Sequence, residues 1–457
     1  MSILRSVSGV RGLAGEEISE DLAACYGRAL GESLRSGAVA VGWDSRPGGD
    51  ALRSAMMDGL LDAGLSVVDL GVVPTPTVGI YVRRHGLAGG VAVTASHNPV
   101  EYNGFKFFSA DGVFLGQREA SELFRLVDGE SDRRASKRGT VRSDTAAASE
   151  HADLVEAGAG VDRQEVRAAG LKIVVDCVNA AGGVLLPGLL KRLGCELVEH
   201  NTQTGSGFPR GAEPTPENLA EFGRVVVSKG ADAGLACDPD ADRLAIVDAD
   251  GRPIGEEYTL AIAVRRALSR KAGPVVVNVS TSGMIDAIAG DAGVPLYRTP
   301  VGELHVVAKM LDVAAVVGGE GNGGVILPEI HLGRDAATAA ALVVGALADV
   351  GKGGVRALIA DLPQYEMVKA KLTLARPLEA NTLAELMRST FPDGRLDRTD
   401  GAKIVWPRSW VHVRMSNTEP VVRIIAEAED VGAAARLADR VGSALSGMTE
   451  VDPSCAG

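Results

Sequence analysis

The sequence predicts an α/β protein made of three successive similar αβα units with mixed, largely parallel sheets, plus a smaller C-terminal α+β domain. One pattern occurs three times: a β-branched run, a loop, a helix-like stretch, a glycine and a second strand. Strands that alternate with helices are typical of βαβ units and parallel sheets. The copies begin near residues 38, 172 and 274, so each is the size of a domain. A chain of 457 residues is also too long for a single hydrophobic core.

Each copy of the pattern supplies two expected strands and one expected helix. They are strand 38–43, a helix ending at residue 63 and strand 66–70; strand 173–176, a helix through 190–193 and strand 196–198; and strand 275–278, a helix ending at residue 289 and strand 294–297. The polar segment 128–149 is expected to be a peripheral helix or loop that leads into the second copy. Residues 336–348 are rich in alanine and too short to cross a bilayer, so they predict a core helix.

The last part of the chain has a different pattern, in which strands follow one another more directly. We expect strands at 366–374, 402–406, 410–414 and 421–428, and helices at 377–391 and 431–445. Short strands joined by turns favour an antiparallel sheet, and the two helices complete a small α+β domain.

Composition and charge exclude several classes of protein. A formal net charge of −12 argues against general nucleic-acid binding, although local loops can still be basic enough for an anionic substrate. The five cysteines form no CxxC pair, and residues 1–12 lack the apolar core of a signal peptide. We therefore expect a reduced, cytoplasmic protein with no nucleic-acid or membrane partner.

Residues 94–99, TASHNP, form the most informative motif and follow the apolar run 90–93. A serine in a loop is commonly only a turn residue. Here Ser96 has a threonine, a histidine and an asparagine around it, and Lys106 follows shortly after. The Gly-x-Ser-x-Gly elbow of hydrolases is absent, which disfavours acyl transfer. Ser96 fits better as a serine that accepts and returns a phosphoryl group.

Residues 238–243, DPDADR, place three carboxylates at alternate positions. In an extended or turn backbone such positions face the same way, so Asp238, Asp240 and Asp242 can converge on one hard cation such as Mg²⁺. A solvated acidic turn is the plainer interpretation, but apolar runs on both sides argue against it. A calcium EF-hand is disfavoured because Arg243 stands where the sixth position of that loop needs glycine.

Residues 414–420, RMSNTEP, are a candidate anion-binding loop that also suits a hairpin turn. Arg414 can bind phosphate oxygens bidentately, and further donors come from Ser416, Asn417 and Thr418. A candidate nucleophile, a hard-metal site and an anion-binding loop together predict phosphoryl transfer.

Residues 318–324, GGEGNGG, contain a single carboxylate among glycines. A flexible loop is one explanation. A ligand-facing turn is the other, and we favour it because Glu320 can accept hydrogen bonds from two vicinal sugar hydroxyls at once.

In this order, the four motifs resemble those of the α-D-phosphohexomutase family, which includes phosphoglucomutase, phosphomannomutase and phosphoglucosamine mutase. The resemblance covers nearly the whole chain, from residues 8–12 through 42–47 and 333–335 to the 414–420 loop. It implies four domains around a central cleft, each contributing one loop. The implied domains are a phosphoserine-loop domain at 1–150, a metal-binding domain at 151–253, a sugar-binding domain at 254–364 and a phosphate-binding domain at 365–457.

The resemblance also implies a role for each candidate residue. Ser96 would be the phosphoserine, and its phosphoryl group would join the three aspartates around one Mg²⁺ per active site. The sugar would contact Glu320 and Asn322; the phosphate that is not transferred would bind Arg414, Ser416, Asn417 and Thr418; and Arg11, His97, Lys106 and Arg243 would lie near the transferred phosphoryl group. Either Lys106 or His97 would accept the hydroxyl proton.

The implied reaction interconverts hexose 6-phosphate and hexose 1-phosphate. Phosphorylated Ser96 donates its group to the substrate, the hexose bisphosphate turns around, and the other phosphate returns to Ser96; the bisphosphate also serves as activator. Two departures from the family pattern stand out: Gly324 replaces a histidine of the sugar loop, and Asn417 replaces a glycine of the phosphate loop. The EGNGG variant resembles the phosphoglucosamine mutase branch. Glucosamine phosphate is therefore the favoured substrate, with glucose and mannose phosphates as alternatives.

Two other functions compete with this one. Phosphatases with an aspartyl nucleophile also carry aspartates after an apolar strand, and such an enzyme would hold phosphate on Asp238 instead of Ser96. A non-catalytic sugar-phosphate sensor is disfavoured because the serine and all three carboxylates are intact. The sequence leaves the oligomeric state open, with a homodimer as one option.

Overall fold

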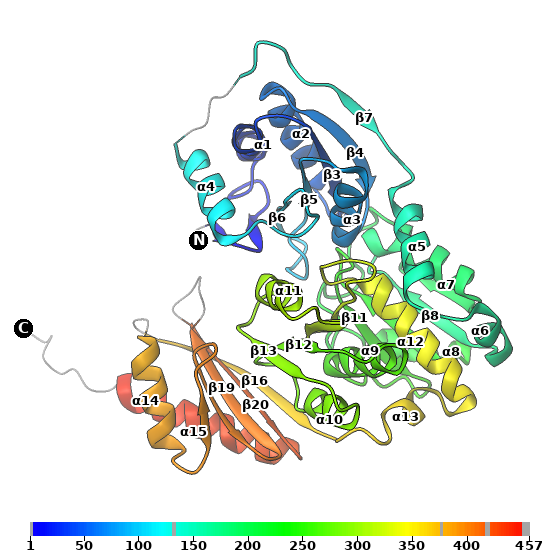
Figure 1. Cartoon of the computed structure of the whole chain (residues 1–457), viewed down its shortest axis with the longest axis vertical. Coiled ribbons are helices and arrows are strands. Elements are labelled where there is room, and N and C mark those ends of the chain that lie inside the picture. The colour runs from blue at the N-terminus through cyan, green and yellow to red at the C-terminus, as the bar shows by residue number, and fades with distance from the viewer. Residues whose placement is uncertain (1–2, 130–133, 375–377, 416–420, 450–457) are drawn as a thin grey trace, which may run out of the picture.

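The computed structural model describes residues 3–129, 134–374, 378–415 and 421–449 (Figure 1). These residues form four sheets that follow one another along the chain, and we name them with their helices the first, second, third and C-terminal units. Three mixed sheets and a last antiparallel one confirm the predicted fold class. The residues at which one unit gives way to the next stay a prediction.

The first unit is a seven-stranded sheet between two layers of helices. Its strands, in order across the sheet, are β1 (Leu4–Ser6), β2 (Gly9–Leu13), β6 (Tyr102–Phe108), β5 (Gly89–Val93), β3 (Ala38–Trp43), β4 (Ser66–Val72) and β7 (Val141–Ser143). Its helices are α1 (Glu20–Leu34), α2 (Gly49–Asp62), α3 (Thr75–His85) and α4 (Gln117–Asp128). The β5–β3–β4–β7 side is parallel and the β1–β2–β6–β5 side is antiparallel. Successive side chains point to opposite faces, so Val39 and Val41 join the core beneath α1 and α2 while Ala40 joins that of α3.

Strand β7 corrects the expectation for segment 128–149, which had no strand in it. Residues 141–143 pair in parallel with β4, and Val67 stands opposite Val141. Figure 1 shows β7 at the outer edge of the first unit, on the path from α4 to α5 (Ala147–Gly158). All three residues of β7 are exposed. A strand without a buried face leaves no alternating pattern in the sequence, so only its backbone pairing reveals it.

The second and third units are four-stranded mixed sheets. Across the second sheet the order is β11 (Leu244–Asp248), β10 (Ala233–Cys237), β8 (Lys172–Asp176) and β9 (Glu196–His200); across the third it is β13 (Leu296–Thr299), β12 (Val275–Asn278), β14 (Val317–Glu320) and β15 (Gly324–Ile326). Their helices after α5 are α6 (Arg163–Ala169), α7 (Leu186–Leu193), α8 (Ala220–Lys229), α9 (Glu256–Arg270), α10 (Met284–Asp291), α11 (Glu303–Asp312), α12 (Ala336–Val350) and α13 (Gly354–Ile359), with short turns η1 (Ala181–Val184) and η2 (Gly351–Gly353). Only β11 and β15 pair antiparallel within the described parts of these two sheets.

Helix α12 lies inside a hydrophobic core that the second and third units share. It contacts α5, α6 and α7 of the second unit and α9 of the third. Residues 336–347 are all buried, and half of them are alanine, the best helix former, whose small side chain lets other helices pack closely. The core helix expected at 336–348 is therefore confirmed, and it holds two units against each other.

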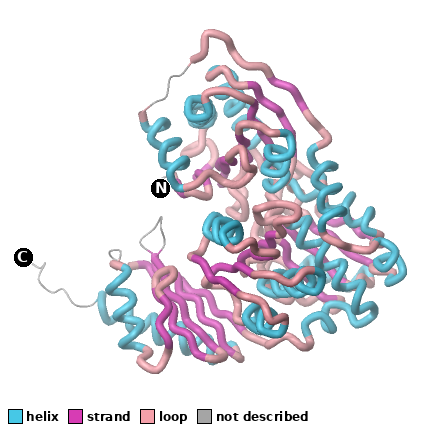
Figure 2. Tube along the Cα trace, viewed as in Figure 1, coloured by secondary structure: helices cyan, strands magenta, loops and turns pink. Residues whose placement is uncertain are grey.

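The C-terminal unit is an antiparallel sheet with helices on one side, as Figure 2 shows. Its strands, in order, are β16 (Glu366–Thr373), β20 (Val421–Ala428), β19 (Ser409–Met415), β18 (Ala402–Trp406) and β17 (Arg395–Asp397), and its helices are α14 (Ala380–Thr390) and α15 (Val431–Thr449). The face opposite the helices meets the third unit through buried polar groups. Lys403 Nζ donates to the carbonyl of Val279 (2.7 Å), and His412 Nδ1 lies 2.9 Å from Ser280 Oγ.

Two further observations concern membrane-spanning helices and cysteines. Across the described residues, no helix combines the length and apolarity that a membrane span requires. Among the described residues, Cys25, Cys177, Cys195 and Cys237 form no disulfide, and Cys455 lies outside that part of the chain.

Candidate active site

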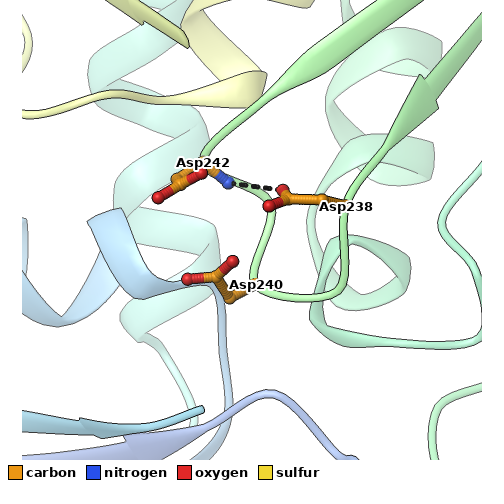
Figure 3. Close-up of side chains that lie close together, drawn as sticks. All are labelled: Asp238, Asp240 and Asp242. Atoms are coloured by element: carbon orange, nitrogen blue, oxygen red, sulfur yellow. Dashed lines mark hydrogen bonds between the residues drawn. The ribbon is translucent and has the colours of Figure 1, made fainter. Parts of the chain in front are cut away.

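Three buried aspartates lie together on the loop between β10 and β11 (Figure 3). Oxygens of Asp238, Asp240 and Asp242 all lie within 4.8 Å of one another. The turn places Ala241 in the left-handed region, with φ of 52°, and the backbone N–H of Asp242 donates to Asp238 Oδ1 (3.1 Å). This turn gathers the alternate carboxylates into one cluster.

Each aspartate has at least one oxygen that accepts hydrogen bonds from protein donors. Asp238 Oδ1 accepts from the backbone N–H groups of Asp242 and Arg243; Asp240 Oδ2 from Thr75 Oγ1 (2.6 Å) and Lys106 Nζ (2.6 Å); and Asp242 Oδ2 from Lys106 Nζ (3.1 Å) and Arg334 Nη2 (2.8 Å). The Oδ1 atoms of Asp240 and Asp242 are buried and have no hydrogen-bond partner. Buried oxygens without a donor are costly unless a ligand satisfies them.

The electrostatics of the cluster suit a divalent cation. Burial, together with the charges of Asp242 and Asp240, raises the pKa of Asp238 well above its ordinary value. Burial also acts to raise the pKa of Asp242, but Arg334 and Lys106 outweigh it and hold that pKa low. For Asp240, the effects of burial and of Asp242 are outweighed by Lys106, so its pKa is low as well. Crowded carboxylates with free oxygens are ligands that a hard divalent cation prefers.

Ser96 lies directly beside this cluster. Its Oγ donates to Asp238 Oδ2 over 3.3 Å, and the residue is fully buried. The loop follows β5, so the end of that strand carries the serine to the aspartates. The φ of Ser96 is 52°, in the left-handed region that residues other than glycine rarely adopt. Such an outlier persists only where the surrounding structure holds it in place.

The groups that hold Ser96 come from the loop after β3 and from its own loop after β5. Arg46 donates to the carbonyl of Ser96 (2.5 Å) and pairs with Asp44 (2.8 Å). Thr94 Oγ1 accepts from the N–H of Ser96 (2.8 Å) and donates to Asp44. We did not single out Asp44 or Arg46 from the sequence, although both lie in the resemblance segment 42–47. A charged pair directly after a buried strand is the signal that could have found them.

Arg11 brings an unpaired positive charge to the site. It donates to Asn98 Oδ1 (3.1 Å) and forms no ion pair with any other residue in the described parts of the chain. Burial lowers the pKa of Arg11 to about 10 although Asp240 opposes it, so the guanidinium remains charged at neutral pH. An unpaired guanidinium at this depth is suited to an anionic ligand.

The other three candidates near Ser96 have different surroundings. Lys106 is held by Asp240 and Asp242, which outweigh burial and raise its pKa. Arg243 pairs with Glu213 (3.1 Å). Burial, followed by the nearby arginines, lowers the pKa of His97 well below its ordinary value, and its buried Nδ1 has no hydrogen-bond partner.

The carboxylate of Glu320 is buried and held by three donors. Asn278 Nδ2 (2.9 Å) and the N–H of Gly302 (3.0 Å) donate to Oε1, while Arg334 Nη1 (2.8 Å) donates to Oε2. Through Arg334 this side chain is linked to the aspartate cluster. Asn322 turns inward on its own loop, where its Oδ1 accepts from the N–H of Gly324 (3.2 Å).

Arg414 lies at the end of β19 and pairs with Asp400 (3.2 Å). The same Asp400 oxygen accepts from the N–H of Val301, the neighbour of Gly302 in the third unit (3.1 Å). The remaining candidates of this loop, Ser416, Asn417 and Thr418, lie outside the described residues. The structure thus places Arg414 beside the third unit but does not test its partners in the loop.

The site is built where strands end. Ser96 follows β5, Asp238 follows β10, and Asn278 and Glu320 are the last residues of β12 and β14. Ligand sites of α/β sheets lie at the carboxyl ends of their strands. Thr75, Asn278 and Glu303 were not predicted from the sequence as site residues, and Arg334 entered only through the resemblance segment 333–335. The importance of these four residues depends on partners that are distant in the chain. For Asn278, a polar residue ending an apolar strand was the available signal.

Models of one protein family match the chain in four consecutive segments. They describe phosphoglucomutase/phosphomannomutase alpha/beta/alpha domain I at residues 3–134, domain II at 150–251, domain III at 255–365 and the C-terminal domain at 367–443.

Similar proteins match over nearly their whole length. A probable phosphoglucosamine mutase of Methanopyrus kandleri is 40% identical over 438 residues, which are 94% of this chain and 95% of that protein. A phosphoglucomutase/phosphomannomutase of Thermococcus kodakarensis is 37% identical over 444 residues, again 94% and 95% of the two chains. Among solved structures, a phosphoglucomutase/phosphomannomutase family protein from Burkholderia thailandensis has a TM-score of 0.82 and 29% identity, covering 98% of this chain and 99% of that one.

Proposed function

Because this chain belongs to the phosphoglucomutase/phosphomannomutase family and is a phosphohexomutase, we propose that it interconverts hexose 6-phosphate and hexose 1-phosphate through phosphorylated Ser96. The observation that carries this proposal is the 3.3 Å contact between Ser96 Oγ and Asp238, in a cluster whose other two aspartates keep free buried oxygens. A nucleophile beside a hard-metal site is what phosphoryl transfer needs.

The residues around Ser96 suit a phosphoryl group. Arg46 and Thr94 fix its backbone, so the Oγ is already oriented when the group arrives or leaves. Arg11 provides the unpaired cation for the phosphoryl oxygens. Asp238, Asp240 and Asp242 would hold Mg²⁺, which would supply positive charge to neutralise the negative charge that develops during transfer. We take the hexose bisphosphate as the activator that phosphorylates Ser96.

His97 and Lys106 have different roles in this proposal. Lys106 already donates hydrogen bonds to Asp240 and Asp242, so its positive charge stabilises these two carboxylates in their ionised form. His97 has a buried Nδ1 without a partner, which suits it to accept the proton of the attacking sugar hydroxyl. Arg243 adds a further cation beside the transferred group.

The sugar and its second phosphate are held by the third and C-terminal units. Glu320 and Asn322 of the same loop bind the sugar, and Arg414 binds the phosphate that is not transferred, together with Ser416, Asn417 and Thr418. The link from Arg414 through Asp400 to the segment beside Gly302 supports this arrangement. We accordingly propose a phosphoserine-loop domain at 1–150, a metal-binding domain at 151–253, a sugar-binding domain at 254–364 and a phosphate-binding domain at 365–457.

An aspartyl nucleophile fits the site less well. Asp238 Oδ1 accepts from two backbone N–H groups, and Oδ2 accepts from Ser96. Both Asp238 oxygens are therefore occupied by hydrogen-bond donors and are poorly placed to attack a phosphoryl group. The Ser96 hydroxyl, in contrast, is a nucleophile that lies next to the proposed metal site. The alternative phosphatase would instead carry its phosphate on Asp238.

Glucosamine phosphate is the proposed substrate, because relatives across most of the chain are named probable phosphoglucosamine mutases. We expect glucosamine 1-phosphate to give the highest kcat/KM, with glucose 1-phosphate second. An assay of 6-phosphate formation from the glucosamine, glucose and mannose 1-phosphates under one set of conditions measures this. Steric differences in an open glycine loop are worth only about 1–3 kcal/mol, or roughly 10- to 200-fold. A preference for mannose 1-phosphate of more than about tenfold would contradict the glucosamine assignment.

Replacement of Arg414 tests the phosphate site of the C-terminal unit. Loss of a charged hydrogen bond costs about 1.5–3 kcal/mol, so Arg414→Ala should lower kcat/KM by about 10- to 150-fold. KM should rise, and kcat should fall as well, because binding of the remote phosphate helps to orient the reacting end. Arg408→Ala is the matched control, since Arg408 is an exposed residue in the β18–β19 turn that pairs with Glu429. Equal kcat/KM for both variants would remove Arg414 from the site.

A further inference from the structure

Arg334 is a buried cation that connects three carboxylates of the site. Its Nη2 donates to Asp242 (2.8 Å), its Nη1 to Glu320 (2.8 Å) and its Nε to Glu303 (2.8 Å). Arg334 directly precedes Asp335, the N-cap residue of α12, so the first turn of that helix holds the backbone next to Arg334 in place. One planar guanidinium therefore joins the aspartate cluster of the second unit to the Glu320 loop of the third.

The Arg334 side chain passes over Gly324. A Cβ built on Gly324 would lie 2.2 Å from Arg334 Cδ and 2.8 Å from Cγ, which no real pair of carbons tolerates. The methylene groups of Arg334 thus occupy the room that any other residue at position 324 would need. This gives a structural reason for the glycine that replaces the histidine of the family pattern.

Arg334 supplies positive charge to three buried carboxylates of the site. Burial raises the pKa of Glu303 to about 7 even with Arg334 opposing it. Asp242, Glu320 and Glu303 are all buried, so removal of the guanidinium would leave them facing one another with fewer donors. Lysine would restore the charge but could not replace three donors in a fixed planar arrangement.

We propose that Arg334 is a positioning residue that sets Glu320 relative to Asp242, and that Gly324 is required because Arg334 fills the space above it. The inference rests on the proposed function, in which Glu320 holds the sugar and Asp242 belongs to the metal site. In both orientations of the bisphosphate the reacting oxygen must reach Ser96, so the distance between these two loops must be fixed.

Arg334→Lys tests the positioning role. Because the phosphate loop still binds substrate, kcat for hexose 1-phosphate should fall by about 10- to 100-fold, while KM changes by less than about threefold. Arg192→Lys is the matched control, as Arg192 forms ion pairs with Asp153 and Glu156 outside the site. Wild-type kcat in Arg334→Lys would overturn the inference, and so would a rise in KM with unchanged kcat.

A double-mutant cycle tests the link to Gly324. Gly324→Ala should reproduce the loss of kcat, because its methyl group displaces Arg334. In the Arg334→Ala background the two carbons closest to that methyl group are absent, which leaves the Asn322 Oδ1 atom at 3.0 Å as the nearest neighbour, so the double variant should be no worse than Arg334→Ala alone. If the kcat losses of the two single variants multiply in the double variant, Gly324 and Arg334 act independently and the proposed link between them is wrong. Gly290→Ala, at a position where a Cβ meets no atom within 4 Å, controls for the glycine substitution itself.

Two further measurements complete the test. The melting temperature with and without Mg²⁺ should show the same Mg²⁺-induced increase in Arg334→Lys and wild type, since Arg334 binds Asp242 Oδ2 and leaves Oδ1 free. If the increase disappears in Arg334→Lys, Arg334 builds the metal site itself and the positioning inference is wrong. Should Arg334→Ala fail to fold, the kinetics of Arg334→Lys decide the matter. Phosphorylation of wild-type Ser96 by glucose 1,6-bisphosphate separates the two hypotheses, because its absence contradicts the proposed function and not the role of Arg334.

Discussion

Ser96→Ala should abolish mutase turnover, lowering kcat by more than about three orders of magnitude. The variant removes the hydroxyl that donates to Asp238, while the hydrogen bonds of Arg46 and Thr94 are made to the backbone carbonyl and N–H of residue 96 and stay in place. We therefore expect a folded protein with the wild-type melting temperature. Hexose 6-phosphate formation from hexose 1-phosphate measures the loss.

Phosphate attached to the protein gives the same test an independent readout. Incubation with glucose 1,6-bisphosphate should add one phosphoryl group to wild type, which peptide mass spectrometry should locate at Ser96. Ser269→Ala is the control. It removes an exposed hydroxyl on α9 that donates to the backbone carbonyl of Arg266, and it should keep both turnover and phosphorylation. Full turnover in Ser96→Ala, or phosphate on Asp238, would exclude the serine mechanism.

Asp240→Asn should lower activity by two or more orders of magnitude, the effect seen when one preorganised electrostatic group is removed from an active site. The amide keeps the shape of Asp240 but removes a negative ligand and its ion pair with Lys106. Mg²⁺ should therefore restore little activity at concentrations that saturate wild type. Initial rates across an Mg²⁺ titration measure the change.

Thermal unfolding separates loss of metal binding from loss of fold. If Mg²⁺ binds only the folded protein, a concentration about 100 times its Kd stabilises wild type by about 2.7 kcal/mol. Asp240→Asn should show little of this stabilisation. Asp250→Asn, an exposed carboxylate near the same hairpin that pairs with Arg356, should show all of it. Undiminished wild-type activity in excess chelator would contradict the metal site altogether.

Local sequence patterns were sufficient for most of the fold. The strands expected at 38–43, 173–176 and 275–278 agree with β3, β8 and β12 to within one residue, because buried parallel strands are continuous β-branched runs bounded by turns. The antiparallel C-terminal sheet was predicted on a different local pattern, short strands that follow one another through turns. Strand β7 was missed because its side chains are exposed on both faces, and its pairing with β4 is a long-range backbone contact.

The candidate site also contains residues that local patterns predict and residues whose role depends on long-range contacts. Alternate spacing along one short loop was enough to bring Asp238, Asp240 and Asp242 together, and a polar loop after a buried strand was enough to single out Ser96. Nothing local to residue 334 indicates that its side chain fills the space above Gly324.

Local spacing was sufficient to place Asp238, Asp240 and Asp242 on one turn and Ser96 in a loop at a strand end, because spacing within a few residues is a property of the backbone. Packing of the first unit against the second then brought the serine to the aspartates. Which carboxylate oxygens stay free also depends on packing between units. That choice depends on Lys106 and Arg334, donors from other units whose long side chains reach the aspartates only after the units pack together. The sequence lists the charged groups of the site, whereas packing sets the distances and burial that determine how strongly they interact.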